Sequence, residues 1–467
     1  MLPDTDLCFV PAAELAARLR RKELSAREVM AAHLARIERL NPRVNAIVTL
    51  VAEQALEAAA AADEALAHGH VPGALHGLPI AHKDLFATKG IRTTLGSRIM
   101  ADFIPDEDAP VVAREKAAGA ITIGKTNTPE FGAGSQTYND VFGETRNPYD
   151  VSRTCGGSSG GAAVALATGM VPLADGSDTG GSLRNPASFC NVVGLRTSPG
   201  LIGQGRWSTL DVAGPMGRTV ADVALLLSVQ SGFDVRSPLT QQIDAAPFRG
   251  PLERDLRGVR VAWSRDLGGL PVDAGVAAVL ERQRSTLVAL GCDVEDTDPP
   301  LDVADGVFEV LRAHNMALTL EPLYDERRTD MKATVVWNIE EGLKLTGAQL
   351  RQAERERAIL NTRMRQFMER YEFIACPVSQ VPPFPVEQRY ITEINGQAMG
   401  SYIEWMRSCS RISATSHPAV SVPAGFTADG LPVGIQFVGR YRDEFGLLQF
   451  AHAFEAATQF GERRPEL

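Results

Sequence analysis

The sequence predicts an α/β protein in which a β-sheet lies between helices on both faces. The main observation is an alternation, from about residue 71 onward, of short apolar runs with helix-like stretches. The apolar runs are typical of buried strands and lie at 78–82, 120–123, 170–174, 259–263 and 293–295. The helix-like stretches include 109–118 and 274–290. Because strands and helices alternate along the chain, we expect the helices to cover both faces of the sheet.

The first seventy residues are predicted to be helical. Ser25 and Glu28 have the spacing of a capping box, and apolar residues then recur at helical spacing up to Leu40. The pair Asn41-Pro42 is expected to end this helix, because proline disfavours the helical conformation of the residue before it. A second helix is predicted over residues 50–67, which are rich in alanine and glutamate.

The C-terminal half continues the pattern. Residues 347–371 predict a long helix with a charged, solvated face, and strands and a terminal helix are expected at 420–422, at 433–438 and from about 443. No internal repeat or low-complexity linker divides the chain. We therefore predict one domain over 1–467, made of an N-terminal helical segment (1–70), a central core (71–230) and a remainder that completes the sheet and covers the pocket (231–467).

Composition argues against several classes of protein. The 467 residues carry a net charge of −10 and no lysine- or arginine-rich run, which argues against a nucleic-acid-binding surface. No basic segment precedes an apolar run at the N-terminus, and no apolar run reaches about 18 residues, so neither a signal peptide nor a membrane span is expected. The six cysteines include no C-x-x-C pair and are expected to be reduced thiols of a cytoplasmic protein. His68 and His70 lack the spacing of a metal site, and no metal or other cofactor is expected.

Residues 119–126, GAITIGKT, match the phosphate-loop pattern G-x-x-x-x-G-K-[ST]. A phosphate loop needs inner residues that wrap a phosphate and a helix that follows. Here three of the four inner residues are β-branched, and a turn sequence with Pro129 follows. We therefore interpret the match as a β-strand and not as a nucleotide site.

Two segments rich in glycine and serine stand out, CGGSSGG at 155–161 and GSDTGGSLR at 176–184. Glycine at this density marks unusual backbone angles or the close approach of a ligand. The apolar residues 162–167 predict a helix that begins at the first segment, where its free N–H groups and positive dipole end would lie.

The first segment also fits G-x-S-x-G, the motif of Ser-His-Asp α/β-hydrolases, with Ser159 as the nucleophile. That motif follows a buried strand, whereas the residues before 155 read as a loop. The histidines that could complete the triad are His417, beside a proline, and His452, in the terminal helix. This hypothesis remains an alternative.

Together with HGLPIAHKD at 76–84, GKTNTPE at 124–130 and GETRNP at 143–148, the two segments resemble the amidase signature hydrolases. The dense resemblance ends near residue 219, and weaker likeness continues at 418–423 and 434–438. In type the chain is most similar to free-standing bacterial amidases and aryl acylamidases. The resemblance implies a mixed, twisted sheet between helices and an amide-cleaving activity.

The resemblance also implies a Lys–Ser–Ser triad, in which Ser182 is the nucleophile, Lys83 the base and Ser158 the proton relay between them. A serine hydroxyl needs such a base. Lys83 can serve only when neutral, so burial must lower its pKa from about 10.4 towards 7–8. A cis peptide bond between Gly157 and Ser158, implied by the same resemblance, would let the Ser158 hydroxyl reach both partners.

The residues around the triad have expected supporting roles. Backbone N–H groups of Thr179, Gly180, Gly181 and Ser182 are expected to bind the oxyanion of the tetrahedral intermediate. Structural support is expected from Gly157, Ser159, Asp178 and Arg184, with a substrate carboxylate as the alternative partner of Arg184. By resemblance, Gly132 offers a backbone carbonyl to the substrate amide, and Ala133 lies beside it.

The expected substrates are small apolar or aryl amides such as anilides, and carbamates (urethanes) and esters can use the same acyl-enzyme route. The aromatic residues expected to line the pocket, with ordinary core packing as the alternative, are Phe131, Trp207, Trp337, Tyr402 and Trp405. No nucleic-acid or membrane partner is expected, and the chain is expected to be a monomer or a homodimer.

The main alternative within the family is the glutamine-hydrolysing component of a tRNA-dependent amidotransferase, which releases ammonia from glutamine inside a complex. In that component, an arginine and an aspartate hold the α-carboxylate and α-amine of glutamine. A rough alignment places Trp337 at the first position and Trp405 or Met406 at the second, so the sequence favours an apolar substrate. A catalytically inactive binding module is a third alternative, and the complete triad argues against it.

Overall fold

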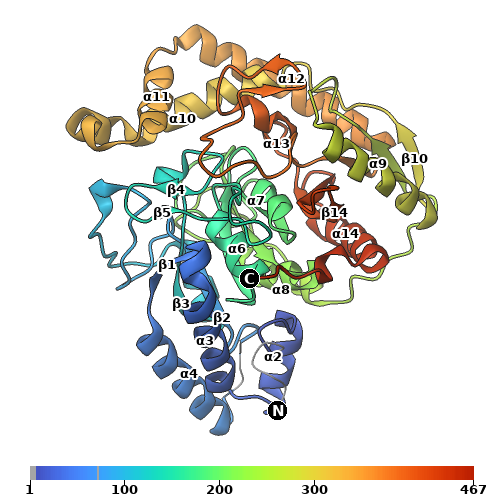
Figure 1. The fold of residues 1–467 in the computed structure, drawn as a ribbon. Coiled ribbons are helices and arrows are strands. Elements are labelled where there is room, and N and C mark those ends of the chain that lie inside the picture. Colours follow the sequence, from blue (N-terminus) through green and yellow to red (C-terminus); the bar gives the residue numbers. More distant parts are fainter. Residues whose placement is uncertain (1–6, 71–72) are drawn as a thin grey trace.

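One large β-sheet organises the computed structural model, which describes residues 7–70 and 73–467 (Figure 1). Within these residues the sheet has eleven strands in the order β1-β3-β2-β6-β8-β7-β14-β15-β11-β9-β10. Their bounds are Ile47–Leu50 (β1), Pro79–Lys83 (β2), Ile121–Thr126 (β3), Leu173–Asp178 (β6), Val193–Arg196 (β7), Val212–Gly217 (β8), Arg260–Trp263 (β9), Asp293–Asp296 (β10), Phe373–Pro377 (β11), Ala419–Phe426 (β14) and Pro432–Val438 (β15). Strands from all three predicted segments therefore join one sheet.

Strand directions in the sheet are mixed. β2 runs parallel to both β3 and β6, and β9 runs parallel to both β10 and β11. The strands between these groups are antiparallel, and β6 pairs along its whole length with β8. Paired on both sides, β6 is a rigid support for the glycine- and serine-rich segment that follows it.

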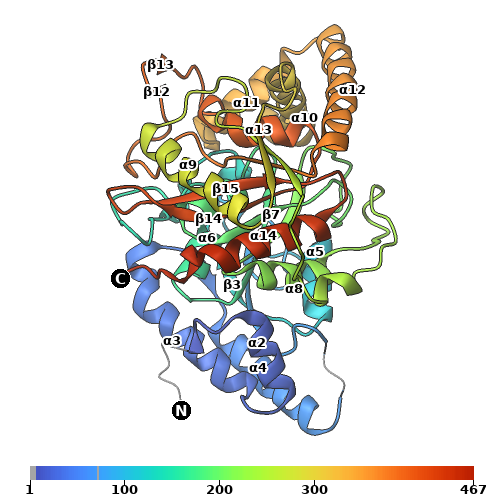
Figure 2. The same ribbon diagram turned by 90° about the vertical axis from the view of Figure 1, so that its right-hand side faces the viewer.

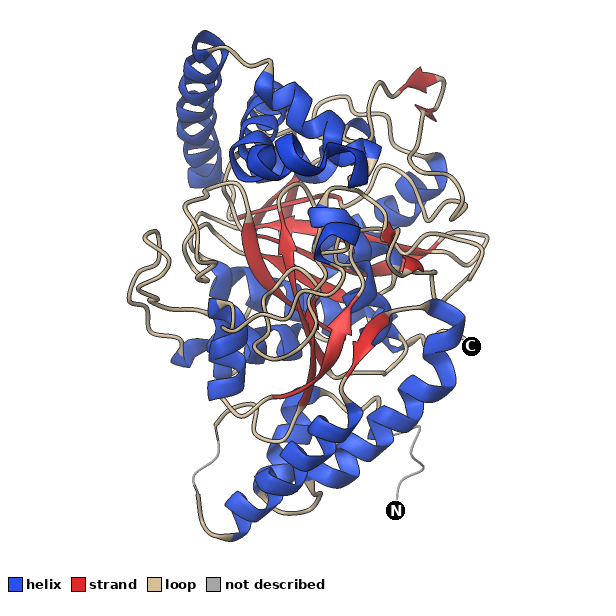
Figure 3. Ribbon diagram, turned by 90° about the vertical axis from the view of Figure 1, so that its left-hand side faces the viewer, coloured by secondary structure: helices blue, strands red, loops and turns tan. Residues whose placement is uncertain are grey.

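Helices cover both faces of the sheet, which confirms the predicted α/β class (Figures 2 and 3). Three N-terminal helices lie at the bottom of Figure 1, and α10–α12 lie at the top. Their bounds are Ala12–Arg20 (α2), Ala26–Val44 (α3), Ala52–Ala67 (α4), Pro110–Ala117 (α5), Gly160–Ala167 (α6), Arg184–Phe189 (α7), Val220–Gln230 (α8), Ala274–Ala289 (α9), Ala304–Arg327 (α10), Ala333–Leu343 (α11), Gly347–Arg370 (α12), Arg407–Ala414 (α13) and Glu444–Thr458 (α14). No helix in the described part of the chain is long and apolar enough to span a bilayer.

The predicted capping box is confirmed at the start of α3. The Glu28 backbone N–H donates to the Ser25 hydroxyl at 3.1 Å, and the Ser25 N–H donates to the Glu28 carboxylate at 2.8 Å. The predicted end at Asn41-Pro42 is wrong, because α3 continues to Val44 with Pro42 inside its last turn. The Asn41 side chain then accepts the N–H groups of Ala46 and Ile47, each at 2.9 Å.

The expectation that the first seventy residues are helical also misses β1, a four-residue edge strand that pairs with β3. The motif GAITIGKT is β3, as the β-branched composition predicted. Lys125 of this motif is fully buried, and its Nζ donates to the Phe86 carbonyl and, at 2.6 Å, to the Thr88 hydroxyl. Lys125 therefore holds a neighbouring loop in place and is not free to bind a phosphate.

The other predicted elements are found with small shifts. α12 buries Ala353, Leu360, Met364 and Met368 along one side, which leaves the charged face in solvent as predicted. The strand predicted at 170–174 begins three residues later, as β6. α6 begins at Gly160, in the last two residues of the first glycine- and serine-rich segment, and continues through the apolar run 162–167 that predicted it.

Candidate active site

Lys83 is the last residue of β2, a strand that is buried along its whole length. Its backbone N–H donates to the Asp175 carboxylate on the adjacent strand β6 at 2.6 Å. Its Nζ donates to three hydroxyl oxygens, those of Ser158 at 2.7 Å, Ser159 at 2.9 Å and Ser177 at 3.0 Å. The sheet therefore presents one buried amine to a cluster of serines.

Burial lowers the pKa of Lys83 to about 7, because an ammonium group loses its hydration inside the protein. Asp178 and Asp175 act in the opposite direction, by attraction to the charged form, and offset only part of this effect. A large fraction of the Lys83 side chains is therefore neutral near pH 7 and can accept a proton.

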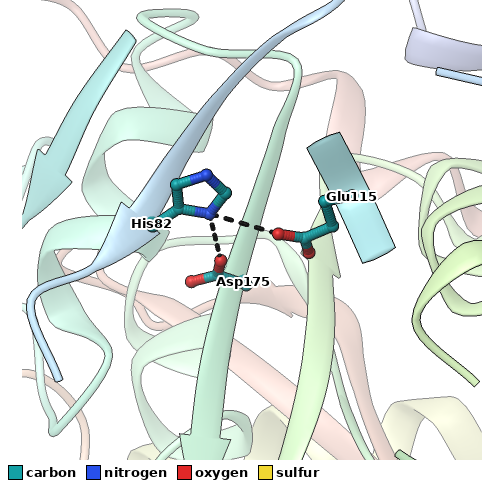
Figure 4. A group of neighbouring side chains, drawn as sticks. All are labelled: His82, Glu115 and Asp175. Carbon is teal, nitrogen blue, oxygen red and sulfur yellow. Dashed lines mark hydrogen bonds and ion pairs between the residues drawn. The ribbon is translucent and has the colours of Figure 1, made fainter. Parts of the chain in front are cut away.

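A second buried cluster lies directly beside Lys83 (Figure 4). The Nδ1 atom of His82 on β2 lies 2.6 Å from Asp175 Oδ2 on β6 and 3.1 Å from Glu115 Oε2 on α5. Its Nε2 atom lies 2.9 Å from the Thr122 hydroxyl. Burial opposes the charged imidazole, but Asp175 and Glu115 outweigh it and raise the pKa of His82 to about 9. Burial, followed by repulsion from Asp175, raises the pKa of Glu115 to about 7.

Ligand atoms of these three residues lie within 4.8 Å of one another, a spacing that could suit a metal ion. Both oxygens of Asp175 already accept hydrogen bonds, one from the Lys83 N–H and one from His82. A charged imidazole between two carboxyl groups thus accounts for the arrangement through hydrogen bonds. Our sequence analysis missed this cluster, although His82 directly precedes Lys83.

Ser158 lies in the loop between β5 (Gly143–Glu144) and α6, and the Gly157–Ser158 peptide bond is cis, as the resemblance implied. A Cβ atom at Gly157 would lie 2.8 Å from the backbone of Gln136, so the loop fits this space only with glycine there. The Gly157 N–H donates to Asn185 at 3.1 Å, and the Ser159 N–H donates to the Ser182 carbonyl at 3.1 Å. These bonds tie the first glycine- and serine-rich segment to the second and to the start of α7.

Ser182 lies between β6 and α7 and lines the same pocket as Ser158. Within residues 7–70 and 73–467, the Ser182 hydroxyl has no hydrogen-bond partner. Its place in the lining of this pocket, with Ser158, is the observation that fits a nucleophile. The N–H groups of Gly180 and Ser182 likewise find no acceptor in the described chain. The Gly181 N–H donates to Asp178 at 2.8 Å, so the prediction that it serves an oxyanion is wrong.

Asp178 braces this segment, as expected. Its carboxylate also accepts the Leu183 N–H at 3.1 Å and forms ion pairs with two fully buried guanidinium groups, those of Arg184 and Arg196. Burial alone would raise the pKa of Asp178, but the two arginines outweigh it and hold the pKa well below its usual range.

Arg184 has a structural role, and the alternative of a substrate carboxylate is not supported. Its guanidinium donates to Asp178 and also to Gln436 at 2.6 Å, Ser413 at 2.7 Å and the Cys409 carbonyl at 3.1 Å. No donor is left for a ligand. Our sequence analysis did not identify Arg196, which comes from a different strand, β7.

A pocket of about 1000 Å³ opens above the serines. Ser158, Ser177, Ser182, Thr179 and Gly180 line one part of it. Apolar side chains line much of the rest, among them Leu85, Leu95, Phe131, Phe308, Met316 and Met406. No histidine of the described chain contributes to the lining, which argues against the Ser-His-Asp alternative.

The structure brings only some of the predicted binding residues to this pocket. Phe131, Gly132 and Tyr402 line it. A Cβ atom at Gly132 would lie 3.8 Å from the Ser158 hydroxyl, which places this glycine close to the serines. Ala133 is buried behind it, and its carbonyl accepts a hydrogen bond from Lys332 at 3.0 Å.

Three predicted tryptophans lie away from the pocket lining. Trp405 is fully buried, donates to Ser135 at 3.1 Å, and packs on Phe189 and Phe384, so the core alternative holds for it. Trp207 is 73% exposed on a surface loop. Trp337 lies on α11 against the ring of Tyr402, with its own ring 5.9 Å from that of Tyr402.

The cysteines contribute no thiolate chemistry to the pocket. All six are buried and form no disulfide. Burial raises the pKa of Cys409, the cysteine that packs beneath Gly181, to about 12. Such thiols stay protonated, and this is consistent with the predicted reduced state.

Comparison with known proteins agrees with the geometry. The family profile described as Amidase matches residues 28–448. The chain is 37% identical to the A subunit of the glutamyl-tRNA(Gln) amidotransferase of Moorella thermoacetica and 34% identical to an acylamidase of Rhodococcus erythropolis, and the alignments cover 98% or more of each chain. Among solved structures, a bacterial aryl acylamidase has a TM-score of 0.90 at 27% identity, with 97% of this chain and 98% of that chain covered. The chain therefore belongs to the amidase signature family of amide-hydrolysing enzymes.

Proposed function

We propose that this enzyme cleaves the C–N bond of small apolar or aryl amides such as anilides, through an acyl-enzyme on Ser182. One observation carries the proposal: a buried lysine with a pKa near 7 is hydrogen-bonded to Ser158 at the pocket that also contains Ser182. A neutral amine in this position is a general base, and the Ser158 hydroxyl can transfer a proton to it.

In the first step, Ser182 Oγ attacks the carbonyl carbon of the amide. Its proton passes to Ser158 Oγ, and the Ser158 proton passes to Lys83 Nζ. The N–H groups of Gly180 and Ser182, which have no acceptor within the described chain, are proposed to bind the oxyanion, and one such donor is worth about 2.7–4 kcal/mol. The hydrogen bond from Ser182 to Ser158 is expected to form when substrate is bound, because catalytic hydrogen bonds often tighten only in the complex.

In the second step, the tetrahedral intermediate collapses and the amine leaves with the proton that Lys83 returns through Ser158. Water then attacks the acyl carbon and gives its proton to Lys83 through Ser158. When the second intermediate collapses, the relay returns this proton to Ser182 Oγ, and the carboxylic acid is released. Esters and carbamates form the same type of intermediate and are expected side substrates. Each step uses only groups of this chain, a water molecule and the amide.

The apolar lining supports the substrate class. Phe131 and Phe308 offer flat surfaces, and Met316 and Met406 are adaptable side chains that suit an aryl or alkyl group. The similarity to an acylamidase and to the fold of an aryl acylamidase points the same way. We also propose a small-molecule substrate as the only required partner and a monomer or homodimer as the functional state.

Glutamine hydrolysis is the second candidate, because the chain is 37% identical over nearly its full length to a component of a glutamyl-tRNA(Gln) amidotransferase. Glutamine carries a charged α-amine, and a site for it needs a hydrogen-bond acceptor or a carboxylate side chain beside this group. Met406, one of the two residues that the rough alignment placed at the aspartate position, lines the pocket and is apolar. This side chain favours the first candidate.

The test measures p-nitroaniline release from p-nitroacetanilide, p-nitrophenol release from matched esters and carbamates, and ammonia release from glutamine. Wild type is run beside Ser182→Ala and Lys83→Ala, with Ser228→Ala and Lys344→Ala as controls outside the pocket. Anilide turnover that is lost only in the first two variants supports the proposal. Glutamine turnover without anilide turnover would establish the second candidate, and activity that survives Ser182→Ala would rule out the proposed nucleophile.

A further inference from the structure

A buried arginine without an acidic partner lines the pocket. Arg312 lies on α10, and the residue is only 9% exposed. Among residues 7–70 and 73–467, no carboxylate forms an ion pair with it. Keeping a guanidinium charge away from water is costly unless an anion or several acceptors compensate, so the environment of Arg312 needs an explanation.

The groups that hold Arg312 are neutral. Its Nη1 donates to the Asn338 side-chain carbonyl, and its Nη2 donates to the Tyr402 hydroxyl oxygen. Asn338 Nδ2 donates to the same hydroxyl at 2.8 Å and to the Thr334 carbonyl at 2.6 Å. These bonds fix the position of the guanidinium but do not neutralise its charge.

The resulting site offers hydrogen-bond donors and lacks acceptors. A guanidinium has five N–H groups, and the described chain supplies Arg312 with acceptors for two of them. Tyr402 accepts two hydrogen bonds, and its own O–H finds no acceptor among the described residues. Both side chains line the pocket, so these donors are available to a ligand. Only an anion or a strong acceptor matches such a set.

The helix places this site at a short distance from the serines. The ring of Phe308 packs against Gly180, because a Cβ atom there would lie 2.6 Å from Phe308 Cζ. Arg312 follows one turn later on the same face of α10, about 6 Å along the helix axis. A ligand that reaches both Ser182 and Arg312 therefore needs a spacer of a few bonds between its two polar ends.

We propose that Arg312 and Tyr402 bind a carboxylate that the amide substrate carries at the end of a short apolar chain or ring, away from the scissile bond. The inference rests on the proposed function and specifies its substrate class. The guanidinium supplies the charge and two parallel N–H donors, Tyr402 adds its O–H, and the apolar lining holds the spacer. Arg184 differs in this respect, because the protein itself uses all its donors.

The test compares pairs of amides that differ only in this charge. The acyl-side pair is glutaric acid monoanilide and 5-methylhexananilide, in which an isopropyl group replaces the carboxylate. The amine-side pair is 3-acetamidobenzoate and 3-acetamidotoluene. For at least one pair, the wild-type kcat/KM is expected to be higher for the anionic amide than for the neutral one. Arg312→Gln is expected to reduce this ratio by about tenfold or more. Tyr402→Phe is expected to reduce it less.

Arg236→Gln is the matched control, because Arg236 also lines the pocket but is already paired with Asp234 at 2.9 Å. It should leave the preference for the anion as it is in wild type. If Arg312 had a purely structural role, Arg312→Gln would lower kcat/KM equally for both members of a pair. The preference for the anion would then be unchanged, and this result would overturn the inference.

A binding measurement separates this inference from the proposed function. The dissociation constants of the four compounds are measured by calorimetry with Ser182→Ala and with the double variant Ser182→Ala/Arg312→Gln. If Ser182→Ala binds an anionic compound more tightly than its neutral partner, and the double variant does not, the carboxylate site is supported. This holds even if wild type cleaves none of the four compounds. Equal binding of each pair to Ser182→Ala, beside good turnover of a neutral anilide, would disprove the inference and leave the proposed function intact.

Discussion

The Asp178 carboxylate accepts a hydrogen bond from the backbone N–H of Gly181, with a distance of 2.8 Å between donor and acceptor. This bond turns the Gly181 N–H away from the pocket, while the N–H groups of Gly180 and Ser182 remain unpaired within the described chain. Two buried arginines fix Asp178 in turn. The shape of the oxyanion loop thus depends on a buried charge cluster.

Asp178→Asn is therefore expected to lower the free energy of unfolding by about 3–5 kcal/mol, because it leaves two buried guanidinium groups without a counter-charge. Urea unfolding measures the change. Asp293→Asn, at an exposed end of β10, is the control and should change stability by less than about 0.5 kcal/mol. Equal stability of the two variants would contradict the assigned role of Asp178.

The value of kcat/KM is expected to rise as the pH increases through about 7 and to level off above it. Burial lowers the pKa of Lys83 to about 7, and only the neutral amine can accept a proton. At lower pH the ammonium form dominates and activity falls. Lys332→Met is the control, since burial also lowers the pKa of Lys332, to about 8, but its Nζ binds the Ala133 carbonyl. A midpoint that moves in this control would assign the titration to another lysine.

Asp175→Asn should move the same midpoint to lower pH. The Asp175 charge raises the pKa of Lys83, so its removal makes the amine easier to deprotonate, while asparagine can still accept the Lys83 N–H. Glu115→Gln is the matched change on the other side of His82, and it should leave the midpoint in place because Glu115 does not contribute to the Lys83 shift. The pH profiles of kcat/KM decide, and a midpoint that rises in Asp175→Asn would refute this account.

Gly180→Ala is expected to reduce kcat by about tenfold or more, because the new methyl group meets the Phe308 ring and displaces the oxyanion loop. Phe308→Leu removes the obstructing part of the ring. The double variant Gly180→Ala/Phe308→Leu should therefore recover part of the activity relative to Gly180→Ala, with Phe308→Leu alone as the reference. Additive losses in the double variant would show that this contact does not cause the effect.

Trp405→Ala should lower the free energy of unfolding by about 3–5 kcal/mol, because its indole fills the core between Phe189 and Phe384. Trp207→Ala removes the same side chain from an exposed loop and should change stability by about 0.5 kcal/mol or less. Thermal and denaturant unfolding of the two variants give the comparison. Similar losses in both would mean that one of these tryptophans is misplaced.

The local features of this chain could be predicted from its sequence. The capping box of Ser25 and Glu28 and the strand at 121–126 depend on neighbouring residues, and both are found. The cis Gly157–Ser158 bond and the contact of Lys83 with Ser158 followed from the family resemblance. The end of α3 was misplaced by two to three residues, because Pro42 lies in the last turn of the helix and the Asn41 side chain accepts the N–H groups that follow Val44.

The features that sequence reasoning missed depend on distant contacts. Glu115, His82 and Asp175 meet only because α5, β2 and β6 come together in the fold. Trp405 and Met406 are neighbours in one short helical turn, yet one faces the core and the other the pocket. Periodicity cannot choose between these two directions in so short an element, and the aromatic pocket was therefore only partly predicted.

The residues proposed to break the bond come from one stretch of the chain, and part of the pocket lining comes from another. Lys83, Ser158 and Ser182 all precede residue 183, whereas Phe308 and Arg312 come from α10, which lies at the top of Figure 1. The two stretches touch at the Phe308–Gly180 contact. Mutations in α10 can therefore change which amide is bound while they leave the residues of the proton relay unchanged. Engineering of a new substrate range should begin with residues 304–327.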